Sequence, residues 1–415
     1  MKTLIMIENY RKSVLENGIR VVTEKIDIVR SISIGVWILA GTRDESANNN
    51  GISHFIEHMV FKGTKTRTAY NVAHYLESLG GSLNAFTGKE LTCYYAKILD
   101  EHLEEAVDII SDIILNPRFD KNDIEKEKKV VVDEIKELED TPGDLIHDFF
   151  FKNIYPDNPL GFSILGSEKN IWNFSKDHLL DYKRSNYTTD RIIISAAGNL
   201  VHTNLIKLIE KYFDISLSNG SRRITPPLPI KKISDVIESS ISQVHICIGA
   251  RSFPFSDGRR FQLLVLNTIL GGGMSSRLFQ NIREKYGLAY SIYSFADFFM
   301  DTGIIGVYVS TEKGKEKSVI ELINGEFENL KNDLVSDDEM KSAKAQLKGG
   351  LILSLENMHN RMNRMAKMEI YLQRFYTIDE IIKYIDMVTK EQLIKLADLL
   401  FDKHSLQTTI LKPSG

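Results

Sequence analysis

Residues 51–63 read Gly-Ile-Ser-His-Phe-Ile-Glu-His-Met-Val-Phe-Lys-Gly, and the rest of the chain is best interpreted from this stretch. Its histidines, His54 and His58, are four residues apart, and Glu57 stands beside the second. Positions i and i+4 lie one above the other on a helix, so two imidazoles at this spacing can reach one metal ion. The residues between them are mostly apolar, which predicts a buried helix whose polar side chains need partners. The alternative is a pair of core histidines that are bonded to backbone carbonyls.

The composition is that of an ordinary globular protein. The chain has 415 residues, of which 43% are hydrophobic and 26% charged, and this length predicts more than one domain. A net charge of −4 gives no basic field that would attract nucleic acid or an anionic membrane. Cys93 and Cys247 are too few for a disulfide framework and form no Cys-x-x-Cys pair, so buried free thiols are expected.

The hydropathy pattern predicts a soluble, cytoplasmic protein. The apolar run before Glu8 is too short for the core of a signal peptide. No apolar run approaches the length of a membrane span.

Strand and helix patterns alternate in mixed order. In the first half, strands are expected near 15–23, 31–40, 82–86, 91–99 and 191–197, and further helices at 68–78, 101–115, 120–140, 143–155, 175–187 and 202–213. No glycine fingerprint for a dinucleotide opens any of the helices. The order predicts an α+β layer structure rather than a doubly wound parallel sheet.

A polar, proline-rich stretch at 216–234 divides this pattern, and the second half of the chain repeats the order of the first. We expect an N-terminal domain at 1–218 that carries the candidate metal site, a linker at 219–233, and a C-terminal domain of the same fold at 234–415; the resemblance described below implies that the first is a zinc-binding catalytic domain and the second a substrate-binding domain. At an offset near 210 residues, a strand at 243–250 and a helix at 259–270 correspond to the strand at 31–40 and the histidine helix. The positions of His54, Glu57 and His58 become Leu264, Asn267 and Thr268, so the second copy is expected to lack the metal site.

The acidic helix at 120–140 offers the missing metal ligand. Catalytic zinc takes three protein ligands and leaves one position for water. An apolar stripe marks the buried face of this helix: Ile124, Val131, Ile135 and Leu138. Only Glu127 and Glu134 combine a carboxylate with the inward side, so a metal ion would compensate one of them and a liganding histidine would hold the other. Glu125, Glu137 and Glu139 are expected on a solvated face.

With these positions in view, the chain resembles the pitrilysin and mitochondrial-processing-peptidase family of zinc metallopeptidases over nearly its whole length. The resemblance implies that Glu134 is the third ligand of one Zn²⁺ per chain and that Glu127 supports a liganding histidine. The segment Asn84-Ala85-Phe86-Thr87 looks like the family's edge strand beside the zinc, where Asn84 and the backbone at Ala85 hold the substrate.

Two segments of the second half, 270–279 and 282–290, are similar to further family signatures. The resemblance implies that Arg283 and Tyr290 reach the substrate from the C-terminal domain. Without the family, Arg283 could equally form a surface ion pair, Tyr290 could be a core aromatic residue, and Gly271–Gly273 could be a flexible connector.

The resemblance also implies an architecture and a reaction. It implies two similar α+β domains, each an antiparallel sheet with helices packed on one face, and a clamshell of four such domains around a chamber. One chain supplies two domains, so we expect a homodimer in which Arg283 and Tyr290 serve the partner's site. The implied activity is a zinc metalloendopeptidase that hydrolyses peptides, with Glu57 as the general base. The alternatives are a catalytic subunit that needs an unlike partner chain and a non-catalytic scaffold subunit of a processing complex.

Overall fold

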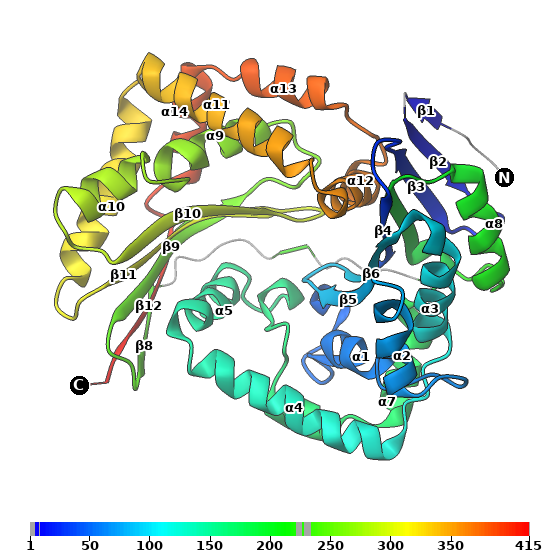
Figure 1. Cartoon of the computed structure of the whole chain (residues 1–415). Coiled ribbons are helices and arrows are strands. Elements are labelled where there is room, and N and C mark those ends of the chain that lie inside the picture. Colours follow the sequence, from blue (N-terminus) through cyan, green and yellow to red (C-terminus); the bar gives the residue numbers. More distant parts are fainter. Residues whose placement is uncertain (1–4, 8, 221–225, 228–233, 415) are drawn as a thin grey trace. The chain divides into compact units, whose positions relative to one another are not determined.

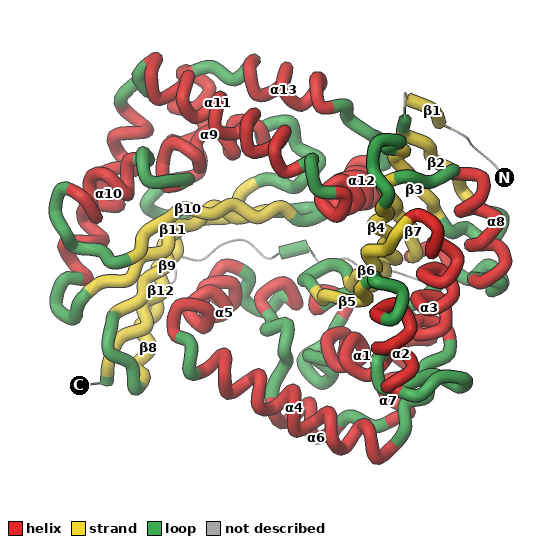
Figure 2. The backbone as a smooth tube through the Cα atoms, in the orientation of Figure 1, coloured by secondary structure: helices red, strands yellow, loops and turns green. Residues whose placement is uncertain are grey.

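The computed structural model describes residues 5–7, 9–220, 226–227 and 234–414 (Figures 1 and 2). By their contacts, these residues form two compact units that interleave along the sequence. Unit 1 comprises residues 1–136, 162–225 and 355–375, and unit 2 comprises residues 137–161, 226–354 and 376–415.

The expected boundaries at 218 and 234 remain a prediction. Within the expected linker, residues 221–225 and 228–233 lie outside the described residues. The two units are not simply successive in sequence. Residues 137–161 of the first half belong to unit 2, and residues 355–375 of the second half belong to unit 1.

Unit 1 is built on a sheet with the strand order β1-β2-β3-β7-β4-β6-β5. Its strands are β1 (Ile5–Ile7), β2 (Tyr10–Val14), β3 (Arg20–Lys25), β4 (Ser31–Ile38), β5 (Ser82–Thr87), β6 (Thr92–Leu99) and β7 (Ile192–Gly198). All neighbouring strands are antiparallel except β3 and β7, which are parallel. The central strand β7 is buried at every residue, as its apolar sequence requires, whereas β5 forms an edge of the sheet.

Helices cover both faces of this sheet. Successive side chains of a strand point to opposite faces, so Val36 packs into the helical layer that holds the main core, while Trp37 packs against α12 (Met358–Leu372). The helical layer consists of α1 (Ile52–Val60), α2 (Ala69–Glu77), α3 (Leu103–Leu115), α4 (Lys121–Glu139), α6 (Glu168–Asn173), α7 (Lys176–Asn186) and α8 (His202–Tyr212). Helix α12 is also tied to the sheet by polar contacts, because Glu369 pairs with Lys12 at 2.7 Å and with Arg20 at 3.3 Å.

Unit 2 is built on a sheet with the strand order β10-β11-β9-β12-β8. Its strands are β8 (Ser234–Ser239), β9 (Val244–Ser252), β10 (Ser291–Phe298), β11 (Gly303–Thr311) and β12 (Gln407–Pro413). One face carries α9 (Arg260–Gly271), α10 (Glu316–Asn332), α11 (Asp337–Ser354), α13 (Ile378–Asp386) and α14 (Lys390–Leu400). The other face is covered by α5 (Pro142–Ile154), whose Phe150 is fully buried against the sheet.

The two sheets share one topology. The order β3-β7-β4-β6-β5 in unit 1 corresponds to β8-β12-β9-β11-β10 in unit 2, and the parallel pair β3–β7 corresponds to the parallel pair β8–β12. This agrees with the duplication expected from the sequence, and the α+β class is confirmed. Each sheet is mixed, and each has a helix on its second face in addition to the expected helical layer.

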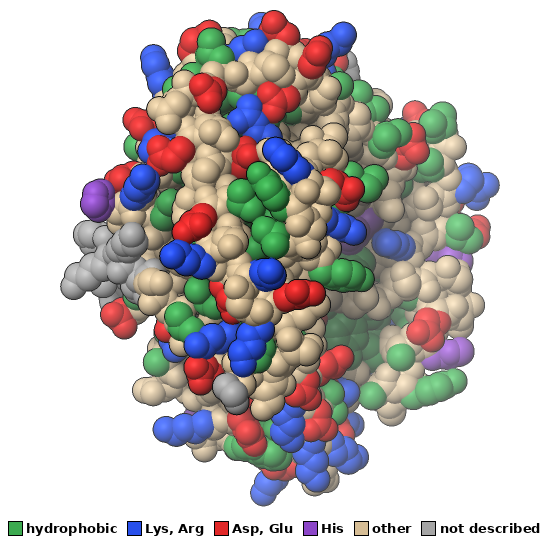
Figure 3. Space-filling view, turned by 90° about the vertical axis from the view of Figure 1, so that its left-hand side faces the viewer, with side chains coloured by type: hydrophobic (Ala, Val, Ile, Leu, Met, Phe, Trp, Pro, Cys, Tyr) green, Lys and Arg blue, Asp and Glu red, His purple; other side chains and the backbone are tan. Residues whose placement is uncertain are grey.

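Two surface properties bear on function. Within the described residues, no helix is both long enough and apolar enough to span a bilayer. On the face shown in Figure 3, Lys and Arg side chains are interspersed with Asp and Glu side chains, as a net charge of −4 suggests.

Candidate metal centre

Helix α1 is fixed at its N-terminus by a buried carboxylate. Glu45 accepts hydrogen bonds from the backbone N–H groups of Gly51 and Ser53, both at 2.8 Å, which satisfies amides that the first helical turn leaves unpaired. Gly51 has a φ of +97° and a Cβ there would lie 2.7 Å from the carbonyl oxygen of Leu165, so glycine is required at this turn. These contacts set the position from which α1 presents its histidines.

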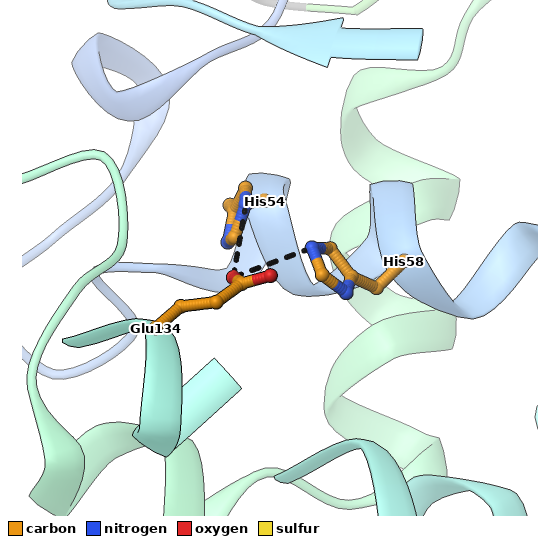
Figure 4. A group of neighbouring side chains, drawn as sticks. All are labelled: His54, His58 and Glu134. Atoms are coloured by element: carbon orange, nitrogen blue, oxygen red, sulfur yellow. Dashed lines mark ion pairs between the residues drawn. The ribbon is translucent and has the colours of Figure 1, made fainter. Parts of the chain in front are cut away.

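Three side chains converge between α1 and α4 (Figure 4). Glu134 Oε2 lies 3.8 Å from Nε2 of His54 and 3.5 Å from Nε2 of His58, and three possible ligand atoms of these residues lie within 4.8 Å of one another. Ligand atoms that are about 2.0–2.1 Å from a tetrahedral zinc ion lie roughly 3.3–3.4 Å apart. The donor set and its spacing therefore fit a zinc ion.

The two imidazoles differ in their surroundings. Burial and the neighbouring His58 together lower the pKa of His54 to about 3, although the charge of Glu127 acts in the opposite direction, so His54 is held as the neutral ring that can bind a metal. Its Nδ1 atom is buried and has no hydrogen-bond partner among the described residues. Burial also lowers the pKa of His58, but the bond to Glu127 and the charges of Glu134, Glu127 and Glu57 outweigh burial and raise it.

Glu127 lies behind His58. Its Oε1 atom is 2.8 Å from Nδ1 of His58, and its Oε2 atom is 2.7 Å from Nζ of Lys62. Burial alone would raise the pKa of Glu127, but the bonds from His58 and Lys62 outweigh burial and lower it. The side chain of Glu127 is only 5% exposed, so an ionised carboxylate stands in the interior with one partner for each oxygen.

Glu57 projects from α1 toward strand β5. Its Oε2 atom accepts a hydrogen bond of 2.5 Å from Oγ1 of Thr87. Burial raises the pKa of Glu57 and the charge of Glu134 adds to this effect, although the bond from Thr87 and the nearby His58 act in the opposite direction. The carboxylate is thus oriented by a hydroxyl of the edge strand.

Strand β5 has β6 as its one neighbour in the described sheet. Asn84 is opposite Tyr95 and is exposed, and the backbone N–H of Ala85 donates to Asn84 Oδ1 at 2.8 Å. Because side chains alternate along a strand, Ala85 and Thr87 share the face toward α1. Backbone groups at Ala85 therefore lie on the strand that also orients Glu57.

Arg283 and Tyr290 belong to unit 2, whereas the metal centre consists of unit 1 residues. Arg283 is exposed in the π-helical turn Phe279–Glu284, with its guanidinium 4.7 Å from the ring centroid of Phe279. Tyr290 is 77% exposed, so it is not a core aromatic residue. It lines a cavity of about 300 Å³ with Gln243, Gly287, Leu288, Ala289, Thr311, Glu312 and Lys315.

Sequence reasoning missed two residues of this site, Lys62 and Thr87. Lys62 follows His58 by four residues, so a helix extended by two residues past its observed end at Val60 would have indicated that Lys62 lies near the histidines. Thr87 lies two residues after Ala85, and strand alternation could have indicated their shared face. Neither residue type by itself suggests a metal site, which explains why both were missed.

The corresponding helix of unit 2 carries Leu264, Asn267 and Thr268. The hydroxyl of Thr268 donates to the carbonyl oxygen of Leu264 within the same helix at 2.9 Å. Leucine offers no ligand atom, and the hydroxyl is used by the helix itself.

Known proteins of related sequence have the same organisation. Residues 20–168 match the model of the insulinase family, peptidase family M16, and residues 173–347 match the model of the peptidase M16 inactive domain. The chain is 41% identical to an uncharacterized zinc protease of Bacillus subtilis over 99% of each chain. It is 36% identical to an uncharacterized zinc protease of Mycobacterium tuberculosis, over 98% of this chain and 93% of that protein.

A solved structure extends the likeness to the whole fold. A protease from Helicobacter pylori matches with a TM-score of 0.91 at 21% identity, and the match covers 97% of this chain and 99% of that one. At this identity the likeness shows the fold alone. Together with the matched family models, the curated relatives confirm the resemblance inferred from the motifs: the chain belongs to the M16 insulinase family of zinc proteases, in the short form with an N-terminal M16 domain and an inactive C-terminal domain.

Proposed function

We propose that this chain is a zinc-dependent endopeptidase that hydrolyses peptides or unfolded segments. The observation that carries the proposal is the convergence of His54, His58 and Glu134 beside the carboxylate of Glu57. Two imidazoles and one carboxylate are three protein ligands, and a catalytic zinc ion with three protein ligands keeps its fourth coordination position for water or substrate. The relatives named as zinc proteases support the same activity class.

His54, His58 and Glu134 would hold the ion, one per chain. When bound, zinc supplies Lewis acidity, which acidifies water and polarises a peptide carbonyl. Glu57 takes a proton from water while the water oxygen bonds to the peptide carbonyl carbon, and it transfers that proton to the amine nitrogen as the C–N bond breaks. The oxygen then remains in the new carboxyl group and the proton on the new amino terminus. The hydrogen bond from Thr87 orients the Glu57 carboxylate for both transfers.

The substrate would bind as an additional strand along β5. An extended peptide can pair with an open strand edge through backbone hydrogen bonds, which gives affinity with little demand on sequence. In the ligand-free arrangement the Ala85 N–H is bonded to Asn84 Oδ1, so a peptide carbonyl would replace that side-chain acceptor and free Asn84 to bond the substrate.

Arg283 and Tyr290 would contact the substrate from a second chain. The family resemblance supports a homodimer, and the exposure of both side chains leaves them accessible to a peptide. Mixing chains that carry Glu57→Gln with chains that carry Arg283→Ala should then restore part of the activity, because each mixed dimer contains one complete site. No recovery in confirmed mixed dimers would contradict this arrangement.

The activity is tested with the purified chain alone. We expect one equivalent of zinc by elemental analysis and cleavage of a quenched fluorescent peptide that a chelator abolishes. Size-exclusion chromatography in the same experiment separates the alternatives. A dimer that cleaves supports the proposal. Zinc binding without cleavage indicates a catalytic subunit that needs an unlike partner chain, and a chain with neither property is a scaffold subunit.

A further inference from the structure

Lys62 is a charged residue beside the metal centre that the proposed chemistry does not use. It lies in the turn just after the end of α1 at Val60, four residues after His58, and its ammonium reaches the same carboxylate that bonds His58. Helix α4 faces Lys62 and the two histidines with Glu134 and Glu127. Glu134 approaches both histidines through their Nε2 atoms, and Glu127 bridges Nδ1 of His58 and the ammonium of Lys62.

We infer that Lys62 is a positioning residue of the metal site: its ammonium holds the Glu127 carboxylate against Nδ1 of His58 and so keeps Nε2 of His58 directed at the ion. This inference rests on the proposed function, because it concerns the binding of zinc by the same residues. It adds a side chain that touches neither the ion nor the substrate.

The Glu127 carboxylate fixes which nitrogen of His58 carries the proton. An ionised carboxylate only accepts hydrogen bonds, so Nδ1 of His58 must carry the proton and Nε2 must carry the free lone pair. Lys62 occupies the other carboxylate oxygen at 2.7 Å. With Lys62 removed, the buried Glu127 would lose the cation that compensates it and would be free to turn away from His58 or to take up a proton.

The sign of the change in zinc affinity when Lys62 is removed distinguishes a positioning role from a purely electrostatic one. Glu57, Glu127 and Glu134 contribute three negative charges, and a divalent ion together with Lys62 contributes three positive ones. If Lys62 acted only through its charge, removing an ammonium from the neighbourhood of a cation would strengthen zinc binding. If Lys62 positions Glu127, its removal weakens zinc binding instead.

The test is the dissociation constant for zinc, measured on the full-length protein by competition with a chromophoric chelator. Residues that orient a metal ligand typically contribute about 10- to 100-fold to metal affinity, so Lys62→Met should weaken zinc binding by about tenfold. Lys62→Arg, which keeps the cation, should restore most of the affinity. Lys128→Met is the matched control, because Lys128 stands next to Glu127 in sequence but its ammonium bonds Glu125 at 2.7 Å.

A double-mutant cycle shows whether Lys62 acts through Glu127. In a Glu127→Gln background, Lys62→Met should have little additional effect on zinc affinity. An unchanged or tighter affinity in Lys62→Met, or an equal loss in both backgrounds, would overturn the inference while leaving the proposed function intact. Absence of zinc binding in the wild-type chain would overturn both. Circular dichroism of each variant checks its folding, and Lys62→Gln replaces Lys62→Met if the latter does not fold.

Discussion

Helices α1 and α9 occupy corresponding places in two sheets of the same topology, yet they present different chemistry. Helix α1 carries His54, Glu57 and His58, whereas the corresponding residues of α9 are Leu264, Asn267 and Thr268. The strand order and the parallel pair are shared. The fold therefore does not require the metal ligands, and the candidate activity depends on a few side chains placed on a scaffold that is stable without them.

The comparison of α1 with α9 assumes that zinc binding depends on the candidate ligands of unit 1, and a substitution at Glu134 tests this assumption. Glu134→Ala removes the carboxylate that faces both Nε2 atoms, so we expect zinc content well below one equivalent and loss of all measurable hydrolysis. Elemental analysis after dialysis provides the measurement. Glu137→Ala, an exposed position on the same helix, is the control and should retain zinc. A full complement of zinc in Glu134→Ala would show that another acid is the ligand.

A substitution at Glu57 distinguishes the binding of zinc by α1 from the catalysis of peptide hydrolysis. Glu57→Gln keeps the shape of the side chain and its contact with Thr87 but removes the base, so turnover should fall by about 10²- to 10⁴-fold with zinc retained. Steady-state kinetics on a quenched peptide, with zinc analysis of the same sample, measure both properties. Normal turnover in this variant would refute the assignment of the base.

A second comparison concerns α12 and α5, the helices on the second face of each sheet. Helix α12 follows α11 in the second half of the chain but packs on the sheet of unit 1, and α5 follows α4 in the first half but packs on the sheet of unit 2. Both helices bury apolar side chains against their sheets, such as Met365 of α12 and Phe150 of α5. Helix α12 is in addition tied to its sheet by the ion pairs of Glu369. The same exchange is thus stabilised by apolar packing in both units and by additional ion pairs at α12.

One substitution in each helix measures how much the ion pairs of α12 and the apolar packing of α5 contribute to stability. Glu369 is 1% exposed, and Glu369→Ala leaves Lys12 and Arg20 without their buried partner, which should cost about 3–5 kcal/mol in the unfolding of unit 1. Phe150→Ala should cost a similar amount, about 3–5 kcal/mol, through a cavity in unit 2. Thermal unfolding monitored by calorimetry measures both effects. Glu321→Ala, at an exposed ion pair, is the control and should change stability by less than about 0.5 kcal/mol.

Local patterns account for what the sequence could predict. The i, i+4 spacing placed His54 and His58 on one face, and the apolar stripe of α4 reduced its acids to Glu127 and Glu134. The structure distinguishes these two by contact, because Glu134 faces the Nε2 atoms and Glu127 bonds Nδ1 of His58. The roles that the resemblance implied, Glu134 as ligand and Glu127 as support of a histidine, stay a prediction for the zinc measurements above.

The remaining features depend on contacts between distant parts of the chain. Helices α5 and α12 each have an apolar face that either sheet could accept, so their periodicity does not indicate which sheet they cover. The parallel pairing of β3 with β7 likewise joins strands that are far apart in sequence. Local sequence patterns carry no information on such choices, because many distant contacts together decide them.

The smallest effect is expected at Thr87, the residue of β5 that orients Glu57. Thr87→Val preserves the shape of the side chain but removes the hydroxyl that donates to Glu57 Oε2. Hydrogen bonds to charged groups contribute about 1.5–3 kcal/mol, and about 1.4 kcal/mol corresponds to a tenfold change in rate. We therefore expect kcat to fall by about 10- to 100-fold, with zinc affinity unchanged, because the hydroxyl of Thr87 bonds Glu57 and not one of the three candidate ligands. Thr87→Ser keeps a hydroxyl and should recover most of the activity. If Thr87→Val instead lowers zinc affinity and leaves kcat at full occupancy unchanged, β5 supports the metal centre and not the base.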